Sequence, residues 1–131
     1  MKKLPVFVYG TLKEGECFDI FRSFKRTIVK GTLQNAALYH LGKFPGLKLS
    51  GDGCVLGELH FYDNIEGLRS VLNRMDRIEG YEGRKTDLFT RKEVDVILQS
   101  GKKMKAYTYL YNGDVMDAWK IASGEWKRDH Q

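Results

Sequence analysis

Residues 63–80, DNIEGLRSVLNRMDRIEG, decide the fold, because they form the clearest helix that the sequence predicts. Apolar side chains recur in this stretch at helical spacing and give one continuous apolar stripe. Asp63 or Asn64 can cap the amino end of this helix, and Gly80 can end it in the left-handed conformation. We therefore expect a helix that packs its apolar face against the remainder of the chain.

Segments with the composition of β-strands lie on both sides of this helix. They are residues 4–9, 27–41 with a bulge or bend at Gly31, 54–62, 88–98 and 104–111. A short amphipathic helix is predicted around residues 18–24, and a helical turn within residues 114–121. This order lacks the strict alternation of a doubly wound fold. It predicts an α+β fold: a mixed, mainly antiparallel sheet that can curl into a small barrel, with flanking helices.

The length and composition favour one soluble domain. The chain has 131 residues, of which 42% are hydrophobic and 30% charged, and a chain of this size can bury a core without disulfides or metal. We take residues 1–131 as a single domain in which residues 112–131 are a C-terminal tail fastened by Trp119 and Trp126. No stretch approaches the roughly 18 apolar residues of a membrane span, and the amino end lacks a signal-peptide pattern. We therefore expect a cytoplasmic protein with no membrane partner.

The cysteines, histidines and basic residues argue against several classes of site. Cys17 and Cys54 form no C-x-x-C pair, and the three histidines share no spacing with them, so we expect no metal site. The 22 basic and 17 acidic side chains leave a net charge of +5, and the basic residues are spread in short doublets. This pattern does not predict nucleic-acid binding, and it suits a small anionic ligand. The oligomeric state is left open.

Gly10 and Gly15 bracket a polar loop directly after the first predicted strand. Their spacing matches the G-x-x-x-x-G part of a phosphate loop, but Glu16 and Cys17 stand where such a loop needs Lys and then Ser or Thr. Nucleotide hydrolysis by this route is therefore excluded. Free backbone N–H groups in such a turn can bind a carboxylate or an oxyanion; the simpler alternative is a tight surface turn.

Glu79 is the strongest candidate for acid–base chemistry. It ends the predicted helix, one residue after apolar Ile78, where the negative end of the helix dipole and partial burial both raise a carboxyl pKa. A glutamate with such a pKa can take and return a proton near pH 7. The alternatives are a solvated acid paired with Arg77 or Arg84, and Glu82 as the functional acid in its place.

Tyr107, Tyr109 and Tyr111 alternate along the last long predicted strand, so they share one face of it. Such a face packs in the core, or it forms a ligand wall that carries hydroxyl groups.

Several of these segments, taken in order, resemble motifs of the gamma-glutamylcyclotransferase-like proteins. VFVYGTLK at residues 6–13 resembles the opening strand and loop of that family, and MDRIEG at residues 75–80 resembles its second motif, which contains the catalytic glutamate. The other similar segments are GKFPG at 42–46, VLGEL at 55–59, LFTR at 88–91 and YTYLY at 107–111. Phe89 departs from the family pattern, which usually has tyrosine at that place.

The resemblance implies an α+β fold with a small mixed barrel, and the release of 5-oxoproline from gamma-glutamyl compounds without a cofactor. By position, the glutamyl group would be held by Tyr9, Gly10, Thr11 and Leu12, the pocket would be lined by Tyr111, and the general base and acid would be Glu79. The partner would be a small gamma-glutamyl molecule whose leaving amine the sequence does not identify. Two alternatives come from other classes: a non-catalytic module that binds small anions or metabolites in the same cavity, and an interaction protein that docks an acidic partner through its basic doublets.

Overall fold

The computed structural model describes residues 1–10, 13, 24–116 and 118–127. Its elements follow the chain in the order β1 (Val6–Val8), β2 (Arg26–Gln34), β3 (Ala37–His40), β4 (Pro45–Lys48), β5 (Cys54–Tyr62), α1 (Ile65–Glu79), β6 (Phe89–Leu98), β7 (Lys103–Tyr111) and β8 (Trp119–Lys120). The predicted helix around residues 18–24 lies outside the described residues except for Phe24.

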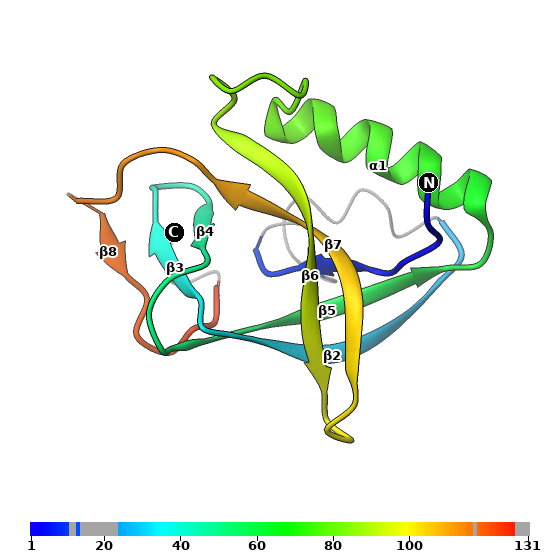
Figure 1. The fold of residues 1–131 in the computed structure, drawn as a ribbon, viewed down its shortest axis with the longest axis horizontal. Helices are drawn as coiled ribbons and strands as arrows, with labels where there is room; N and C mark the ends of the chain where they lie inside the picture. The colour runs from blue at the N-terminus through cyan, green and yellow to red at the C-terminus, as the bar shows by residue number, and fades with distance from the viewer. Residues whose placement is uncertain (11–12, 14–23, 117, 128–131) are drawn as a thin grey trace.

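Five strands close into a barrel in the order β1-β5-β2-β6-β7 (Figure 1). β2 pairs with β5 along its whole length, and β6 and β7 form a long antiparallel pair. The barrel closes where Val6 of β1 lies parallel to Tyr107 of β7, and the Tyr107 N–H donates to the Pro5 carbonyl at 2.9 Å. The prediction of an α+β fold with a mixed, mainly antiparallel barrel is confirmed.

A second sheet, in the order β4-β3-β8, lies beside the barrel (Figure 1). The helical turn expected within residues 114–121 is present in part, since the Ala118 N–H donates to the Val115 carbonyl at 3.1 Å. Strand β8 corrects the rest of it, because Trp119 and Lys120 are extended and pair with His40 and Tyr39. The free edge of β3 offers backbone partners that local helical spacing does not reveal. Trp119, which was expected to fasten the tail, is 78% exposed and contacts the domain through His40, whose ring lies 5.9 Å from the indole.

The expected strand at residues 27–41 also differs in two respects. It is two strands, β2 and β3, because the chain turns at Asn35, which adopts a φ of 57°. Gly31 is not a bulge, since it pairs in register with Gly57 of β5 and Leu98 of β6. A Cβ at Gly31 would lie 2.6 Å from Cγ1 of Val96, so the glycine is required by the close approach of a side chain from the neighbouring strand β6.

Helix α1 is fixed by local signals at both ends. Asn64 caps it, and its Oδ1 accepts from the Gly67 N–H at 2.7 Å, while Gly80 ends it with a φ of 70°. The predicted caps are therefore confirmed. The buried residues of the apolar stripe are Leu68, Val71, Leu72 and Met75, whereas Ile78 near the carboxyl end is 44% exposed. Within the described part of the chain, α1 is the single helix, and no helix there is long and apolar enough to cross a membrane.

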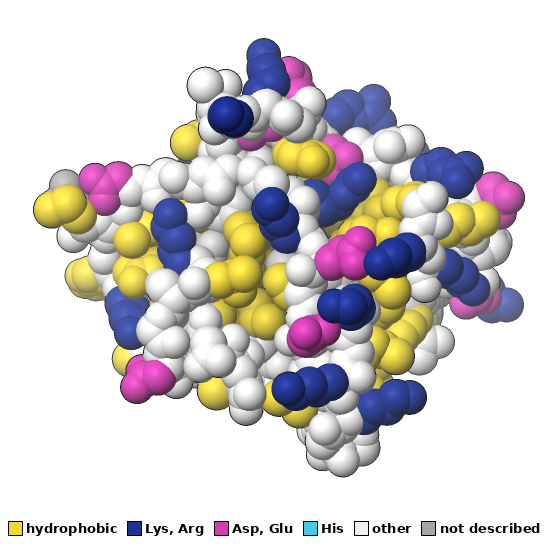
Figure 2. Space-filling view, in the orientation of Figure 1, with side chains coloured by type: hydrophobic (Ala, Val, Ile, Leu, Met, Phe, Trp, Pro, Cys, Tyr) yellow, Lys and Arg dark blue, Asp and Glu magenta, His cyan; other side chains and the backbone are white. Residues whose placement is uncertain are grey.

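Strand β1 is buried on both faces and joins two parts of the core. Val6 and Val8 pack in a cluster with α1, whereas Phe7 and Tyr9 belong to a second cluster. The turn after β1 therefore starts inside the molecule, and Gly10 is buried. On the face shown in Figure 2, Lys and Arg side chains are spread among acidic and apolar ones and form no single patch.

Candidate active site

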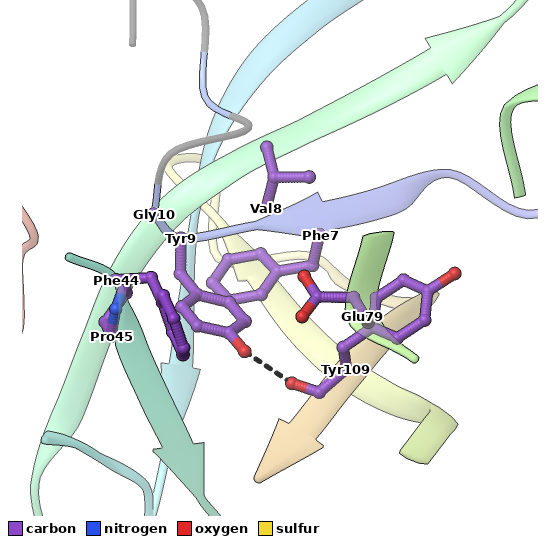
Figure 3. A pocket seen from close by; sticks show the side chains of 8 residues that line it. All are labelled: Phe7, Val8, Tyr9, Gly10, Phe44, Pro45, Glu79 and Tyr109. Carbon is purple, nitrogen blue, oxygen red and sulfur yellow. Dashed lines mark hydrogen bonds between the residues drawn. The ribbon is translucent and has the colours of Figure 1, made fainter. Parts of the chain in front are cut away.

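A small cavity lies where the end of β1 meets the carboxyl end of α1 (Figure 3). It is lined by Phe7, Val8, Tyr9, Gly10, Phe44, Pro45, Glu79 and Tyr109. Its volume is about 30 Å³, room for about two water molecules. The fold thus brings the Tyr9–Gly10 turn and Glu79, which are far apart in sequence, to one hollow.

Glu79 is the acid of this cavity. It is the last residue of α1, and its carboxylate is turned toward the rings of Phe7 and Tyr9 (Figure 3). Burial raises the pKa of Glu79 from its ordinary value of 4.5 to about 7. Near neutral pH the carboxyl group is therefore present in both protonation states, which is the condition for accepting and returning a proton in one cycle.

Tyr9 is a neutral hydrogen-bond donor in the wall of the cavity. Its hydroxyl donates to the Tyr109 carbonyl at 2.6 Å. Burial raises the pKa of Tyr9 well above its ordinary value, and the charge of Glu79 acts in the same direction. The hydroxyl therefore stays protonated at any pH at which Glu79 titrates.

Gly10 and Pro45 pack against each other at the side of the cavity. A Cβ on Gly10 would lie 2.7 Å from Cγ and 2.8 Å from Cδ of Pro45. Because the proline is rigid, a larger residue at position 10 would push the β3–β4 turn away from β1. Glycine at this place lets the turn lie directly on the backbone that follows β1.

The remaining residues expected at the site are placed differently. Thr11 and Leu12 lie outside the described residues. Tyr111 is not among the described residues that line the cavity. Its ring lies 5.2 Å from that of Phe89, which in turn lies 6.0 Å from that of Phe44. Tyr111 therefore lies behind the cavity wall, in an aromatic row that begins with Phe44.

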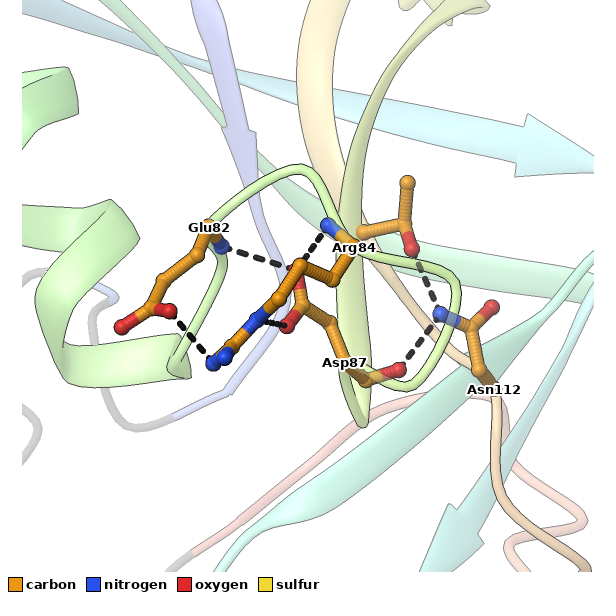
Figure 4. A network of polar contacts seen from close by, with 5 residues as sticks. Glu82, Arg84, Asp87 and Asn112 are labelled. Carbon is orange, nitrogen blue, oxygen red and sulfur yellow. Dashed lines mark hydrogen bonds and ion pairs between the residues drawn. The ribbon is translucent and has the colours of Figure 1, made fainter.

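Glu82, the alternative candidate for the acid, is not among the described residues that line the cavity, and its side chain lies against Arg84 (Figure 4). Its side chain is 63% exposed and pairs with Arg84. The Arg84 guanidinium also lies 3.6 Å from the carboxylate of Asp87. This carboxylate accepts hydrogen bonds from the backbone N–H groups of Glu82 and Arg84 at 2.8 and 3.0 Å. Residues 82–87 are thus a loop held by its own polar network, beside the site and not in it.

Tyr109, Asp76 and Arg91 are the neighbours of Glu79 that sequence reasoning did not assign a role at the site. The Tyr109 hydroxyl donates to Oδ1 of Asp76 at 2.5 Å, and Arg91 donates to Oδ2 of Asp76 at 2.8 Å. Alternation along β7 places Tyr109 and Tyr111 on one face, and helical spacing places Asp76 one turn before Glu79. Strand alternation and helical spacing therefore identify Tyr109, Tyr111 and Asp76 as candidates. Which tyrosine reaches the cavity depends on how β7 lies against β1 and α1, and the sequence does not specify that.

Residues 6–128 match the family described as gamma-glutamyl cyclotransferase, AIG2-like. The chain belongs to this family. It is 32% identical over 126 residues to the gamma-L-glutamyl-butirosin B gamma-glutamyl cyclotransferase of Niallia circulans, with 94% of this chain and 75% of that protein covered. The family assignment makes the chain an enzyme of the gamma-glutamylcyclotransferase kind.

Solved structures agree with this fold. The solution structure of the protein ytfP from Escherichia coli matches with a TM-score of 0.64 at 26% identity, covering 98% of this chain and 100% of that one. A structure from Arabidopsis thaliana matches with a TM-score of 0.69 at 24% identity, covering 98% of this chain and 80% of that one. The second likeness concerns the fold alone.

Proposed function

We propose that this protein releases 5-oxoproline from a gamma-glutamyl amine or peptide, with Glu79 as the general base and acid. The observation that carries the proposal is the position of Glu79, whose carboxylate shares one cavity with the Tyr9–Gly10 turn. The family to which the chain belongs supports the class of reaction. The burial that raises the pKa of Glu79 to about 7 supports its role.

The reaction needs one proton carrier and no external nucleophile. The free α-amino group of the substrate attacks its own γ-carbonyl carbon, and a C–N bond forms while the carbonyl oxygen takes up negative charge. Glu79 accepts the proton that the attacking nitrogen loses. It then donates that proton to the leaving nitrogen as the original C–N bond breaks. Lactam and amine are formed, no water is consumed, and Glu79 returns to its starting state.

The turn after β1 would stabilise the developing oxyanion. Backbone N–H groups at the Tyr9–Gly10 turn are the donors that we assign to this role together with Thr11 and Leu12. Losing one such donor typically costs about 3–4 kcal/mol of transition-state stabilisation. Acid–base catalysis by Glu79 would contribute about 10²–10⁴-fold in rate. Holding amine and carbonyl together in a narrow site supplies a further share by orientation.

The lining of the cavity suggests how the substrate lies. We place the reacting carbonyl between Glu79 and the Tyr9–Gly10 turn, which line one cavity. The α-carboxylate and the leaving group would then extend toward Phe44, which lines the same cavity and is 42% exposed. The aromatic row of Phe44, Phe89 and Tyr111 would then lie beside the substrate there.

The test is to incubate the protein with a panel of gamma-glutamyl compounds and to detect 5-oxoproline by mass spectrometry. The panel contains gamma-glutamyl amino acids, glutathione, a gamma-glutamyl isopeptide of lysine and a gamma-glutamylated aminoglycoside. The last compound is included because the relative from Niallia circulans is named for gamma-L-glutamyl-butirosin B. We expect product from at least one of them.

The matched variants are Glu79→Gln and Glu82→Gln, which remove one carboxylate each, three residues apart. We expect Glu79→Gln to keep the fold and lose about 10²–10⁴-fold in kcat, and Glu82→Gln to keep its activity because its side chain is exposed and paired with Arg84. Equal activity of both variants would remove Glu79 from the mechanism. Tight binding of glutamyl ligands without product would instead favour a non-catalytic binding module.

A further inference from the structure

We propose that Tyr109 is a positioning residue that fixes Glu79 relative to the Tyr9–Gly10 turn, acting together with Asp76 and Arg91. This inference rests on the proposed function and adds residues to it. Tyr109 lies in β7, and its side chain forms part of the cavity wall beside Glu79 (Figure 3). The backbone carbonyl of Tyr109 binds the residue that follows β1, and its hydroxyl binds α1. These are the two elements that must face each other across the cavity.

The backbone end of Tyr109 holds β1. The Tyr9 hydroxyl donates to the Tyr109 carbonyl at 2.6 Å, and this hydrogen bond is buried. A second buried hydrogen bond joins the same two segments, because Thr108 Oγ1 donates to the Phe7 carbonyl at 2.9 Å. The end of β1 is therefore fixed to β7 at the point where the cavity begins.

The side-chain end of Tyr109 holds α1. Its hydroxyl donates to Oδ1 of Asp76 at 2.5 Å, and Asp76 lies one helical turn before Glu79. Tyr109 is 3% exposed, so solvent competes little for its hydroxyl. Fixing Asp76 fixes the last turn of the helix, and with it the direction in which Glu79 leaves the helix.

Arg91 completes this arrangement from β6. It donates to Oδ2 of Asp76 at 2.8 Å, so each oxygen of the carboxylate has its own partner. The guanidinium lies 5.7 Å from the centre of the Tyr81 ring and 5.8 Å from that of Tyr107. The ion pair of Arg91 and Asp76 therefore adds no net charge beside the site. The titratable groups in the cavity itself are Tyr9 of β1, Tyr109 of β7 and Glu79 of α1.

The chain offers a matched control for Tyr109. Tyr107 lies on the same strand and face, has a buried ring, and donates its hydroxyl to the Lys2 carbonyl at 2.6 Å. Tyr107→Phe therefore removes a comparable hydroxyl that does not reach α1. We compare Tyr109→Phe with Tyr107→Phe in kcat, in KM and in thermal unfolding.

We expect Tyr109→Phe to remain folded and to lower kcat by about 10–100-fold with little change in KM, because a displaced acid–base group costs rate more than binding. Tyr107→Phe should keep the wild-type kcat. The effects of Asp76→Ala and Tyr109→Phe should not add, since both break one connection. Wild-type kcat in Tyr109→Phe, or equal losses in the two tyrosine variants, would overturn the proposal.

A second readout does not depend on turnover. The carboxyl carbon of Glu79 is titrated by NMR in protein labelled at glutamate. In Tyr109→Phe we expect the midpoint to fall from about 7 toward its ordinary value, because a loosened helix end admits water, whereas Tyr107→Phe leaves it unchanged. An unchanged midpoint in Tyr109→Phe would overturn the positioning role. If the wild-type protein gives no 5-oxoproline, the proposed function fails and this titration alone decides the role of Tyr109.

Discussion

Glu79 couples the stability of the protein to pH because its carboxyl group is buried. Its pKa is about 7 in the folded protein and ordinarily 4.5, so between these values the folded state binds more protons than the unfolded state. Stability that is present below pH 4.5 is then lost as the pH rises through 7. We expect Glu79→Gln, which stays neutral, to be more stable than the wild type at pH 8 by about 2–3 kcal/mol.

Urea unfolding at pH 5 and pH 8 measures this difference. The control is Glu82→Gln, whose side chain is 63% exposed and whose removal should not change the slope with pH. A wild-type protein whose free energy of unfolding does not fall relative to Glu79→Gln between the two pH values would contradict the burial of Glu79 in the folded state.

The same ionisation predicts the pH dependence of activity. Glu79 must be a carboxylate to accept the proton of the attacking amine, so kcat/KM should rise with pH through about 7. The substrate amine must also be unprotonated, which adds a second rise at higher pH, because the α-carboxylate beside it stabilises the ammonium form. Initial rates measured from below pH 4.5 up to alkaline pH test this expectation. A kcat/KM that rises only near pH 4.5 would mean that an ordinary, solvated carboxylate is the base.

At the scale of the elements, the sequence predicted best where a local signal decides the conformation. Asn64 and Gly80 bound α1 as expected, because capping depends on the neighbouring backbone alone. The prediction was wrong where the conformation depends on a partner that is distant in the sequence. Residues 119–120 are extended because β3 offers an edge, and the glycine at position 31 is explained by Val96 of the neighbouring strand β6.

The loop between α1 and β6 depends on one carboxylate. Asp87 accepts from the Glu82 and Arg84 N–H groups, and the Asn112 side chain donates to its carbonyl at 3.0 Å (Figure 4). The first of these bonds is the largest cause of a pKa lowered below the ordinary 3.8. The carboxylate therefore contributes stability above the unfolded pKa of 3.8, and this contribution is lost as the pH falls below it.

We accordingly expect Asp87→Asn to lower Tm at pH 7, and the difference from the wild type to shrink toward pH 3. The control is Asp95→Asn, because Asp95 is 59% exposed and makes one ion pair to Lys105 at 3.3 Å. Calorimetry at the two pH values is the measurement. An Asp87→Asn protein with the wild-type Tm at pH 7 would show that the loop does not depend on this group.

At the scale of the whole molecule, the cavity exists because several elements meet. β1, the β3–β4 turn, α1 and β7 each contribute to its wall. The sequence singled out Glu79 and the Tyr9–Gly10 turn, since each carries a local chemical signal. It did not select Tyr109 over Tyr111, because that choice is set by the register of β7 against β1 and by the approach of α1. The way the strands of the barrel pair therefore determines which tyrosine of β7 reaches the site.

The C-terminal tail is anchored in the core by Trp126. Trp126 is completely buried in the cluster that also contains Phe7 and Tyr9, and its carbonyl accepts from Lys13 Nζ at 2.7 Å. Trp119, seven residues earlier in the same tail, is 78% exposed. The two residues have the same chemistry and opposite environments, so they form a matched pair for substitution.

Trp126→Ala should lower the free energy of unfolding by about 3–5 kcal/mol, because it leaves a large cavity in the core. Trp119→Ala should change it by no more than about 0.5 kcal/mol, as expected of an exposed side chain. Urea unfolding measures both, and Trp126→Phe shows whether a smaller ring restores part of the loss. Because Phe7 and Tyr9 pack in the cluster of Trp126 and line the cavity, Trp126→Phe should also lower kcat, whereas Trp119→Ala should not. Equal losses from the two alanine substitutions would mean that the tail is not held by Trp126.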